Sequence, residues 1–325
     1  MKRIPIILFF LVLAPAASAQ RSIDEVLRQV ENASRELEAQ RQLTAAQKQD
    51  AATGKYMANP TVEMEKMWGA AGAGQNTELA VVQTIDFPTV YGSRNRIAKL
   101  KGSLYEKQWE SQRQQLLLQA KQLCIEIVYL YRQRDLLDER LSNAERLSEA
   151  YRRKMETGDA TSLEANKIAV ESISAHTAAD LNRAELQAKI QQLNTMTGDS
   201  DDSFEDVTYT PVETLPPADV LSEAYMSGNP LLESMENTLE IDRRTVALNR
   251  GLSLPQFEIG YRHDYGEGRA TGFKVGMSVP LFENKNKVKA AKAAAVSSQA
   301  QLESARTNAA SQFRMLYDQA VALSE

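Results

Sequence analysis

The chain of 325 residues is poor in the residue types from which enzymes build reactive sites. It has a single cysteine, Cys124, which cannot form an intramolecular disulfide and lies in a helical pattern typical of a buried side chain. Its two histidines, His176 and His263, have no cysteine or second histidine nearby, so no zinc-binding spacing exists. Aromatic residues make up only 6%, which favours long helices over a compact enzyme core.

Charge of one sign and long hydrophobic runs are also scarce. The net charge is only -5 and no basic block occurs, so nucleic acid is not an expected partner. After residue 20, no segment approaches the roughly twenty consecutive apolar residues of a membrane helix. No phosphate-binding glycine loop or nucleophile elbow is present. We interpret Met57, Met64 and Met67 as packing residues rather than copper ligands, and we expect no enzyme activity, metal site or cofactor.

The first 19 residues predict a secretory signal peptide. Lys2 and Arg3 precede a short apolar run, and a small-x-small cleavage site ends at Ala19. The apolar run is too short to cross a bilayer, so we expect it to be cleaved. The mature chain is then either soluble in the periplasm or enters a membrane as β-strands.

The rest of the chain contains an internal duplication. Residues 59–64 match residues 254–259 as Pro-x-apolar-Glu-apolar, and the same offset places Leu37 on Leu232. Residues 96–101 match residues 287–292 at nearly the same offset. The order of helix, two strands and helix therefore occurs twice. The expected segments are a helix over 20–57, a strand pair over 58–90, a second helix over 218–251 and a second strand pair over 252–283.

Each predicted strand alternates between apolar and polar residues. In the second pair, Phe257, Ile259 and Tyr261 alternate with Glu258 and Arg262. Two interpretations compete: the apolar faces meet in the core of a soluble sheet, or they face lipid in a membrane barrel. The signal peptide and a strand length of about ten residues favour the barrel. Glu63, Glu65, Glu258 and Arg262 are then predicted to face a water-filled pore, and the paired carboxylates need no catalytic explanation.

A long helical hairpin is predicted between the strand pairs, over 91–198. Leucines recur every seven residues from Leu116 to Leu137, which indicates a coiled-coil seam. The first helix should end near Gly158, and a capping box of Thr161 and Glu164 should begin the return helix. Residues 199–217 are acidic and proline-containing, and they are predicted to be a connector.

In its order of motifs the sequence resembles the TolC-like outer-membrane efflux factors. The likeness is carried by Asn59-Pro60, by residues 82–87 and 91–96, by residues 158–164, and by Leu254-Pro255 with residues 278–282. Residues 86–92 look most like the branch that serves heavy-metal efflux.

The resemblance implies a mixed α+β membrane protein and a passive role in export. Each subunit of a homotrimer would give four strands to a twelve-stranded outer-membrane barrel, continued by a helical tunnel in the periplasm. The chain would be the outer-membrane exit duct for metal ions or small toxic compounds, in contact with outer-membrane lipid. The hairpin tip would contact a periplasmic adaptor protein and, through it, an inner-membrane pump of the RND type. The tip residues are Gly158, Asp159, Thr161, Ser162 and Glu164.

Two expectations concern the rest of the chain. Residues 284–325 begin a second long helix that stops before a second tip, so we expect either a fragment or a natural truncation, with roughly 70 further residues in the native protein. Without a partner helix, this segment should expose an apolar stripe. The stripe would contain Ala294, Leu302, Ala305, Ala309, Phe313 and Leu316.

The alternative function is a periplasmic coiled-coil scaffold or tether, which explains the heptads but not the duplicated strand pairs.

Overall fold

A computed structural model describes residues 22–68, 75–198, 214–266, 269–280 and 282–324. The predicted signal peptide, the loop at 69–74 and most of the acidic connector lie outside the described residues. The chain divides into two compact units, Met1–Glu36 with Gln115–Val212, and Leu37–Gln114 with Glu213–Glu325. The long helix α3 (Pro88–Glu156) contributes to both. No helix in the described part of the chain is both long and apolar enough to cross a membrane.

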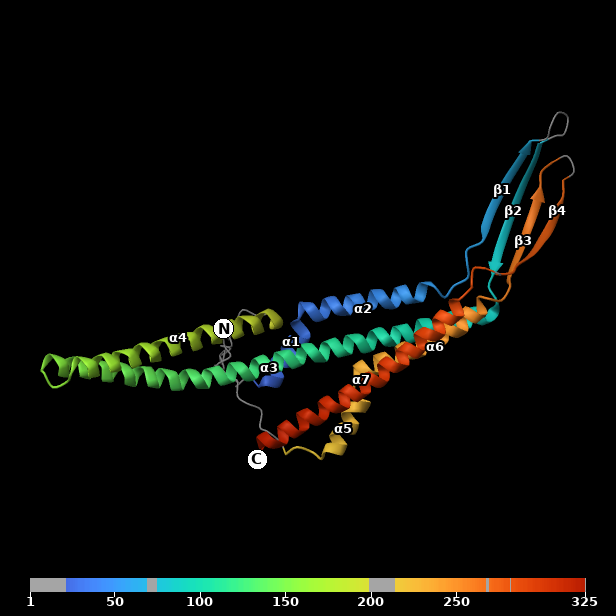
Figure 1. The fold of residues 1–325 in the computed structure, drawn as a ribbon. Helices are drawn as coiled ribbons and strands as arrows, with labels where there is room; N and C mark the ends of the chain where they lie inside the picture. Colours follow the sequence, from blue (N-terminus) through green and yellow to red (C-terminus); the bar gives the residue numbers. More distant parts are fainter. Residues whose placement is uncertain (1–21, 69–74, 199–213, 267–268, 281, 325) are drawn as a thin grey trace, which may run out of the picture. The chain divides into compact units, whose positions relative to one another are not determined.

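The first unit is an antiparallel helical hairpin with a short third helix. From Gln115 onward α3 runs beside α4 (Ser162–Thr197), and the chain reverses between them (Figure 1). The predicted seam is buried in its first half and includes Leu116, Leu123 and Leu130. Helix α1 (Ile23–Ala33) packs on α4 and buries Ile23, Val26 and Val30. Cys124 is buried in this core, and burial raises the pKa of its thiol to about 11, which leaves it unreactive at neutral pH.

Polar contacts between α3 and α4 fix the hairpin register. The Lys189 ammonium lies 2.7 Å from the Glu126 carboxylate, and Arg183 lies 2.6 Å from Asp138. The amide of the buried Asn182 donates to the side-chain oxygen of Gln133 at 3.1 Å. Because partners earlier on α3 lie opposite residues later on α4, the helices are antiparallel. A buried polar residue such as Asn182 favours one register over others.

The second unit contains one four-stranded antiparallel sheet in the order β1-β2-β3-β4. Its strands are β1 (Thr61–Trp68), β2 (Gln75–Ile85), β3 (Gln256–Asp264) and β4 (Thr271–Ser278). The two predicted strand pairs therefore join through β2 and β3, where Val81 lies opposite Tyr261 and Thr84 opposite Glu258.

Helices in the second unit correct one expectation about the C-terminal segment. Helix α7 (Lys287–Ser324) packs along α6 (Pro230–Gly251), and Leu302 and Ala309 are buried. Phe313 stacks on Tyr225 of α5 (Ala218–Ser227) with ring centroids 5.7 Å apart. The prediction that Leu302 and Ala309 would be exposed is wrong, because α6 and α5 supply a partner that does not belong to a second hairpin. Ala294 and Leu316 are exposed as expected.

The duplication extends to a break in each preceding helix. The single helix expected over 20–57 is two helices, α1 and α2 (Arg35–Thr53), separated by the extended backbone of Ser34. In the second half the break falls at Asn229, whose side chain accepts a hydrogen bond from the backbone N–H of Leu231 and starts α6 at Pro230. Leu37 and Leu232 each lie three residues after their break. The Asn-Pro pair is a helix-start signal in the sequence, and Ser34 directly before α2 is also a residue type favoured at helix starts.

Candidate functional site

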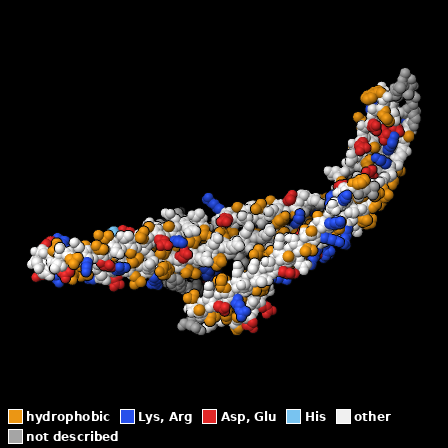
Figure 2. All heavy atoms as spheres, viewed as in Figure 1, with side chains coloured by type: hydrophobic (Ala, Val, Ile, Leu, Met, Phe, Trp, Pro, Cys, Tyr) orange, Lys and Arg blue, Asp and Glu red, His pale blue; other side chains and the backbone are white. Residues whose placement is uncertain are grey.

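The sheet has one continuous apolar face. Tyr261 lies between Val81 and Phe273, and Ile259 is paired with Val275. Val62 and Met64 continue this face onto β1. These side chains are exposed: 52% for Ile259, 79% for Val275 and 86% for Phe273. Apolar side chains line the visible edge of the sheet in Figure 2. Among the described residues, therefore, the apolar faces of the strands do not meet in a core.

The opposite face carries the charged residues of β2 and β3 and the glutamates of β1, while Lys66 of β1 shares the face of Met64. The register places Glu63, Ala80 and Arg262 in one row across three strands, and Glu65, Glu78 and Asp264 in the next. Arg262 forms an ion pair with Glu78 and lies 3.7 Å from Asp264. Glu258 lies on the same face, opposite Thr84 and Gly276. The structure thus brings Glu63, Glu65, Glu258 and Arg262 onto one face.

A glycine on the polar face permits close approach of two strands. Gly260 is buried opposite Val82, and a Cβ atom there would lie 2.9 Å from the carbonyl oxygen of Val81. Ala80 and Val82 are each only 6% exposed, although they share the face with the charged residues. Sequence alternation placed no buried residues on this face, because closeness between strands is a tertiary property.

Asp86 ties the sheet to the helices. Its carboxylate accepts hydrogen bonds from Arg94 at 2.7 Å and from the side-chain amide of Gln256 at 2.8 Å. Its backbone N–H donates to the Tyr91 hydroxyl oxygen at 2.9 Å. One residue therefore links the end of β2, the start of β3 and the first turns of α3. No sequence pattern predicts this junction, since Asp86 and Gln256 lie far apart in the chain.

The hairpin tip has the local structure that the sequence predicts. Gly158 adopts a left-handed φ of +84°, and the N–H of Asp159 donates to the carbonyl oxygen of Lys154 at 2.8 Å. The Thr161 hydroxyl accepts from the backbone N–H of Glu164, whose carboxylate accepts from the backbone N–H of Thr161 at 2.9 Å. This capping box lowers the pKa of Glu164, chiefly through the backbone hydrogen bond from Thr161.

All five predicted tip residues are exposed. Gly158, Asp159, Thr161, Ser162 and Glu164 make only local contacts, and Leu163 between them is 64% exposed. Capping accounts for Gly158, Thr161 and Glu164. The exposed leucine has no structural explanation within the tip.

A charged network lies on the last turns of α3 before the tip. Glu149 accepts hydrogen bonds from Arg152 and Arg153 at 2.9 to 3.0 Å, and Arg152 also pairs with Glu156 at 2.8 Å. Hydrogen bonds from Arg152, and then from Arg153, lower the pKa of Glu149 to about 2. The carboxylate is therefore charged over the whole physiological range.

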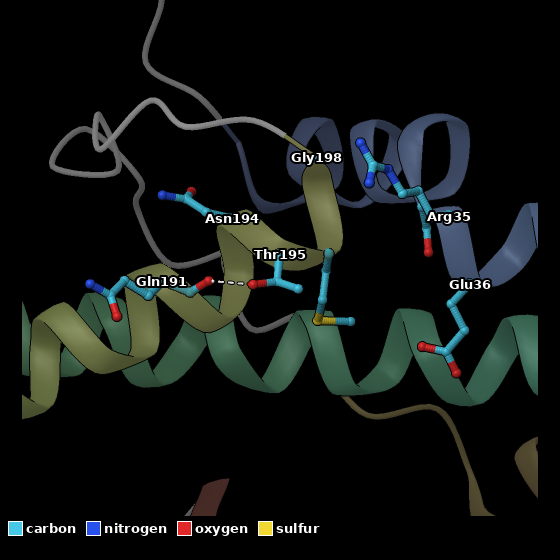
Figure 3. Close-up of a pocket in the computed structure, with 8 residues that line it drawn as sticks. Arg35, Glu36, Gln191, Asn194, Thr195 and Gly198 are labelled. Atoms are coloured by element: carbon cyan, nitrogen blue, oxygen red, sulfur yellow. Dashed lines mark hydrogen bonds between the residues drawn. The ribbon is translucent and has the colours of Figure 1, made fainter.

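The first unit also contains an open cavity of about 810 Å³, beside the end of α4. Figure 3 shows Arg35 and Glu36, next to the helix break, and Gln191, Asn194 and Thr195 from α4. The Thr195 hydroxyl donates to the backbone oxygen of Gln191 at 2.9 Å. The residues described around this cavity include no histidine or cysteine.

The described residues contain no group of three or more metal-ligating side chains suited to holding an ion. His176 pairs with Asp180 at 2.9 Å on the surface of α4, and His263 contacts the Thr271 hydroxyl at 2.9 Å. Both histidines are thus engaged locally. Met64 lies on the apolar face of the sheet, while the register places Met67 on the polar face.

Comparison with known proteins identifies relatives by structure alone. No family model and no curated protein matches the chain. A membrane protein from Pseudomonas aeruginosa is similar with a TM-score of 0.70 and 16% identity, over 89% of this chain and 74% of that chain. The CmeC outer membrane channel of Campylobacter jejuni is similar with a TM-score of 0.68 and 15% identity, over 92% of this chain and 73% of that chain. CusC, solved in a study of transmembrane channel formation, is similar with a TM-score of 0.66 and 13% identity, over 92% of this chain and 77% of that chain.

These matches cover both the helices and the strands of the chain. Identities this low carry information on the fold and not on substrate or partners. Long antiparallel helices joined to a sheet of four antiparallel strands give this chain the fold of the TolC-like outer-membrane channels.

Proposed function

We propose that this chain is the outer-membrane exit duct of a tripartite efflux system, a passive channel without chemistry of its own. The observation that carries the proposal is the exposed apolar face of the sheet, with Ile259, Val275 and Phe273 on one side and Glu258 and Arg262 on the other. In water such a face would favour aggregation. In a bilayer the same face is stabilised by lipid, while the charged face lines water.

The open edges of the sheet support assembly from several copies. Among the strands that the structure describes, β1 and β4 each have a neighbour on one side only. Unpaired backbone N–H and C=O groups are costly in lipid, so four strands must be completed by others. A homotrimer would close a barrel of twelve strands, an arrangement consistent with the fold of the similar channels.

The outer surfaces of the helices support the same assembly. Helix α3 has a second apolar stripe, of Leu118, Ile125, Tyr129 and Leu136, and these residues are 42 to 68% exposed. Their spacing of seven, four and seven residues keeps them on one side of the helix, as in a coiled-coil seam. Packing of this stripe against another copy would build a tunnel wall of helices in the periplasm.

The tip is proposed as the contact for a periplasmic adaptor, which would connect the duct to an inner-membrane pump of the RND type. Gly158, Asp159, Thr161, Ser162 and Glu164 would form this contact, and the exposed Leu163 offers an apolar anchor. We propose metal ions or small toxic compounds as the exported substrates. The metal alternative rests on the likeness of residues 86–92 to the heavy-metal branch.

Fractionation of cells that express the chain tests the proposal directly. A channel should remain in the outer-membrane fraction after a high-salt wash, whereas a periplasmic scaffold should be released. Purified chain reconstituted into planar bilayers should then show discrete conductance steps. Release by salt, together with the absence of conductance, would contradict the channel and favour the scaffold.

A further inference from the structure

Basic residues gather on the first turns of the two long helices that leave the sheet. Residues 87–105 contain four basic residues, and residues 284–302 contain four more, with no carboxylate in either segment. Each segment is the next helical region after a strand pair, which ends with β2 in one case and β4 in the other. Lys and Arg side chains are visible over the helices next to the sheet in Figure 2. We call these two segments the basic collar.

Most of the collar is exposed and has no ionic partner among the described residues. Arg96, Lys285, Lys289 and Lys292 are exposed and form no ion pair within the described ranges. Lys287 is 3.5 Å from Glu283, whose side chain is itself 82% exposed. Arg94 differs, since it is held by Asp86. The charges are thus available to an anion outside the chain.

Helix stability does not explain this placement. Neither α3 nor α7 has an acidic residue in its first turn. The start of a helix carries partial positive charge within its first turn, so Lys287 and Lys289 of α7 lie where cations are unfavourable. In α3 the basic residues begin at Arg94, beyond the first turn. The two collar segments occupy equivalent positions of the duplication, with Arg96 matching Lys287 and Lys101 matching Lys292.

A second observation comes from the segments that join helices to the sheet, before β1 and after β4. These segments expose large apolar and aromatic side chains at the helix end of the strands. Phe282 is 84% exposed, Tyr56 is 67% exposed and Val279 is 50% exposed. Lys55, one residue before Tyr56, lies 5.3 Å from the centre of its ring. From the sheet outward, the order is therefore an apolar band, an aromatic rim and then basic residues.

This order matches the layers of a bilayer surface. Aromatic rings favour the boundary between hydrocarbon and headgroups, and basic residues just beyond it are attracted to anionic lipid. We propose that the basic collar binds the headgroups of anionic phospholipids in the leaflet that faces the helices. The proposal rests on the proposed function, because it requires the sheet to lie in a membrane. It adds a lipid specificity and fixes the depth at which the sheet stops.

The test uses the full chain reconstituted into vesicles of phosphatidylcholine alone or with phosphatidylglycerol. Flotation measures the fraction of chain bound at low and at high salt. One variant replaces Arg96, Lys285, Lys289 and Lys292 with Gln. A control variant replaces the same number of exposed basic residues in the other unit, namely Arg28, Lys121, Arg132 and Lys167. Conductance of every sample is recorded in parallel.

We expect wild type and control to bind anionic vesicles better by on the order of tenfold at low salt, with a smaller preference at high salt. The collar variant should lose most of this preference while its conductance per inserted channel stays unchanged. A collar variant that keeps the full preference would overturn the proposal. The proposal would also be overturned if the collar variant bound vesicles as well as wild type and its channels had a different reversal potential. That result would place these charges in the lumen of the channel. Failure of wild type to insert or conduct at all would count against the proposed function instead.

Discussion

The sheet and the hairpin of this chain use the same kinds of apolar residue in opposite ways. In the hairpin, Leu123 and Leu130 are almost fully buried between the two helices. In the sheet, Ile259 and Phe273 are exposed, and the charged residues share the other face. A helix pair in water must bury its own seam, whereas a strand in lipid needs no protein partner for its apolar face. The comparison predicts that equal substitutions in the two regions will have different effects.

The largest effect is expected in the hairpin seam. Leu130→Asp should destabilise the hairpin by about 3–5 kcal/mol, since it leaves an unpaired charge between α3 and α4. Leu136→Asp is the matched control, because Leu136 is 68% exposed and should tolerate the change. Urea unfolding of monomeric chain, followed by far-UV circular dichroism, measures both. Similar losses in the two variants would mean that the buried seam is assigned wrongly. Gln133 is a poor control because Asn182 donates a hydrogen bond to it.

A somewhat smaller effect is expected for charges on the sheet. Ile259→Arg should reduce stable insertion by about 2–4 kcal/mol per chain if the position lies near the middle of the bilayer. The neighbouring Glu258 lies on the polar face, so Glu258→Arg should reduce insertion only slightly. The measurement is the fraction of chain that remains in membranes after an alkaline wash. Equal losses at both positions would contradict the assignment of lipid-facing and water-facing sides.

The tip should respond weakly to loss of its cap. Thr161→Ala removes the hydroxyl that accepts from the N–H of Glu164 and should cost about 1 kcal/mol. Thr161→Ser retains the hydroxyl and should have a stability close to that of wild type.

If the tip binds an adaptor, Leu163→Ala should weaken binding without changing the thermal midpoint. If Thr161→Ala weakened adaptor binding and Leu163→Ala did not, the proposed role of Leu163 as an anchor would be contradicted.

The smallest effect is the pH dependence of the charged network before the tip. The pKa of Glu149 is lowered to about 2 in the folded chain, from 4.5 as a model value. A lowered carboxyl pKa contributes stability above pH 4.5, and this contribution is lost as pH falls toward about 2. The thermal midpoints of wild type and Glu149→Gln should therefore differ at pH 6 and converge near pH 2. If the difference in thermal midpoint stayed constant from pH 6 to pH 2, the ion pairs of Glu149 would be excluded as the cause of that difference.

Periodic patterns in the sequence predicted the local structure of both regions well. Seven-residue spacing identified the seam at Leu116, Leu123 and Leu130, and the residue types at Gly158 and Thr161 predicted the turn and the cap. The prediction was weaker at the end of this seam, where Leu137 is only half-buried. Heptad spacing identifies the side of a helix that faces its partner, but it does not determine how closely the partner approaches.

The sequence by itself determined the strands, the long hairpin and the face on which their side chains lie, because helix and strand periods follow from backbone geometry. It did not show the breaks at Ser34 and Asn229. Only the tertiary structure decided which strands are neighbours, and so placed Arg262 beside Glu78 and Gln256 beside Asp86. It also decided that α6 and α5 cover Leu302 and Phe313. Contacts of this kind join residues far apart in the chain. Their choice depends on how whole elements pack, which no short stretch of sequence encodes.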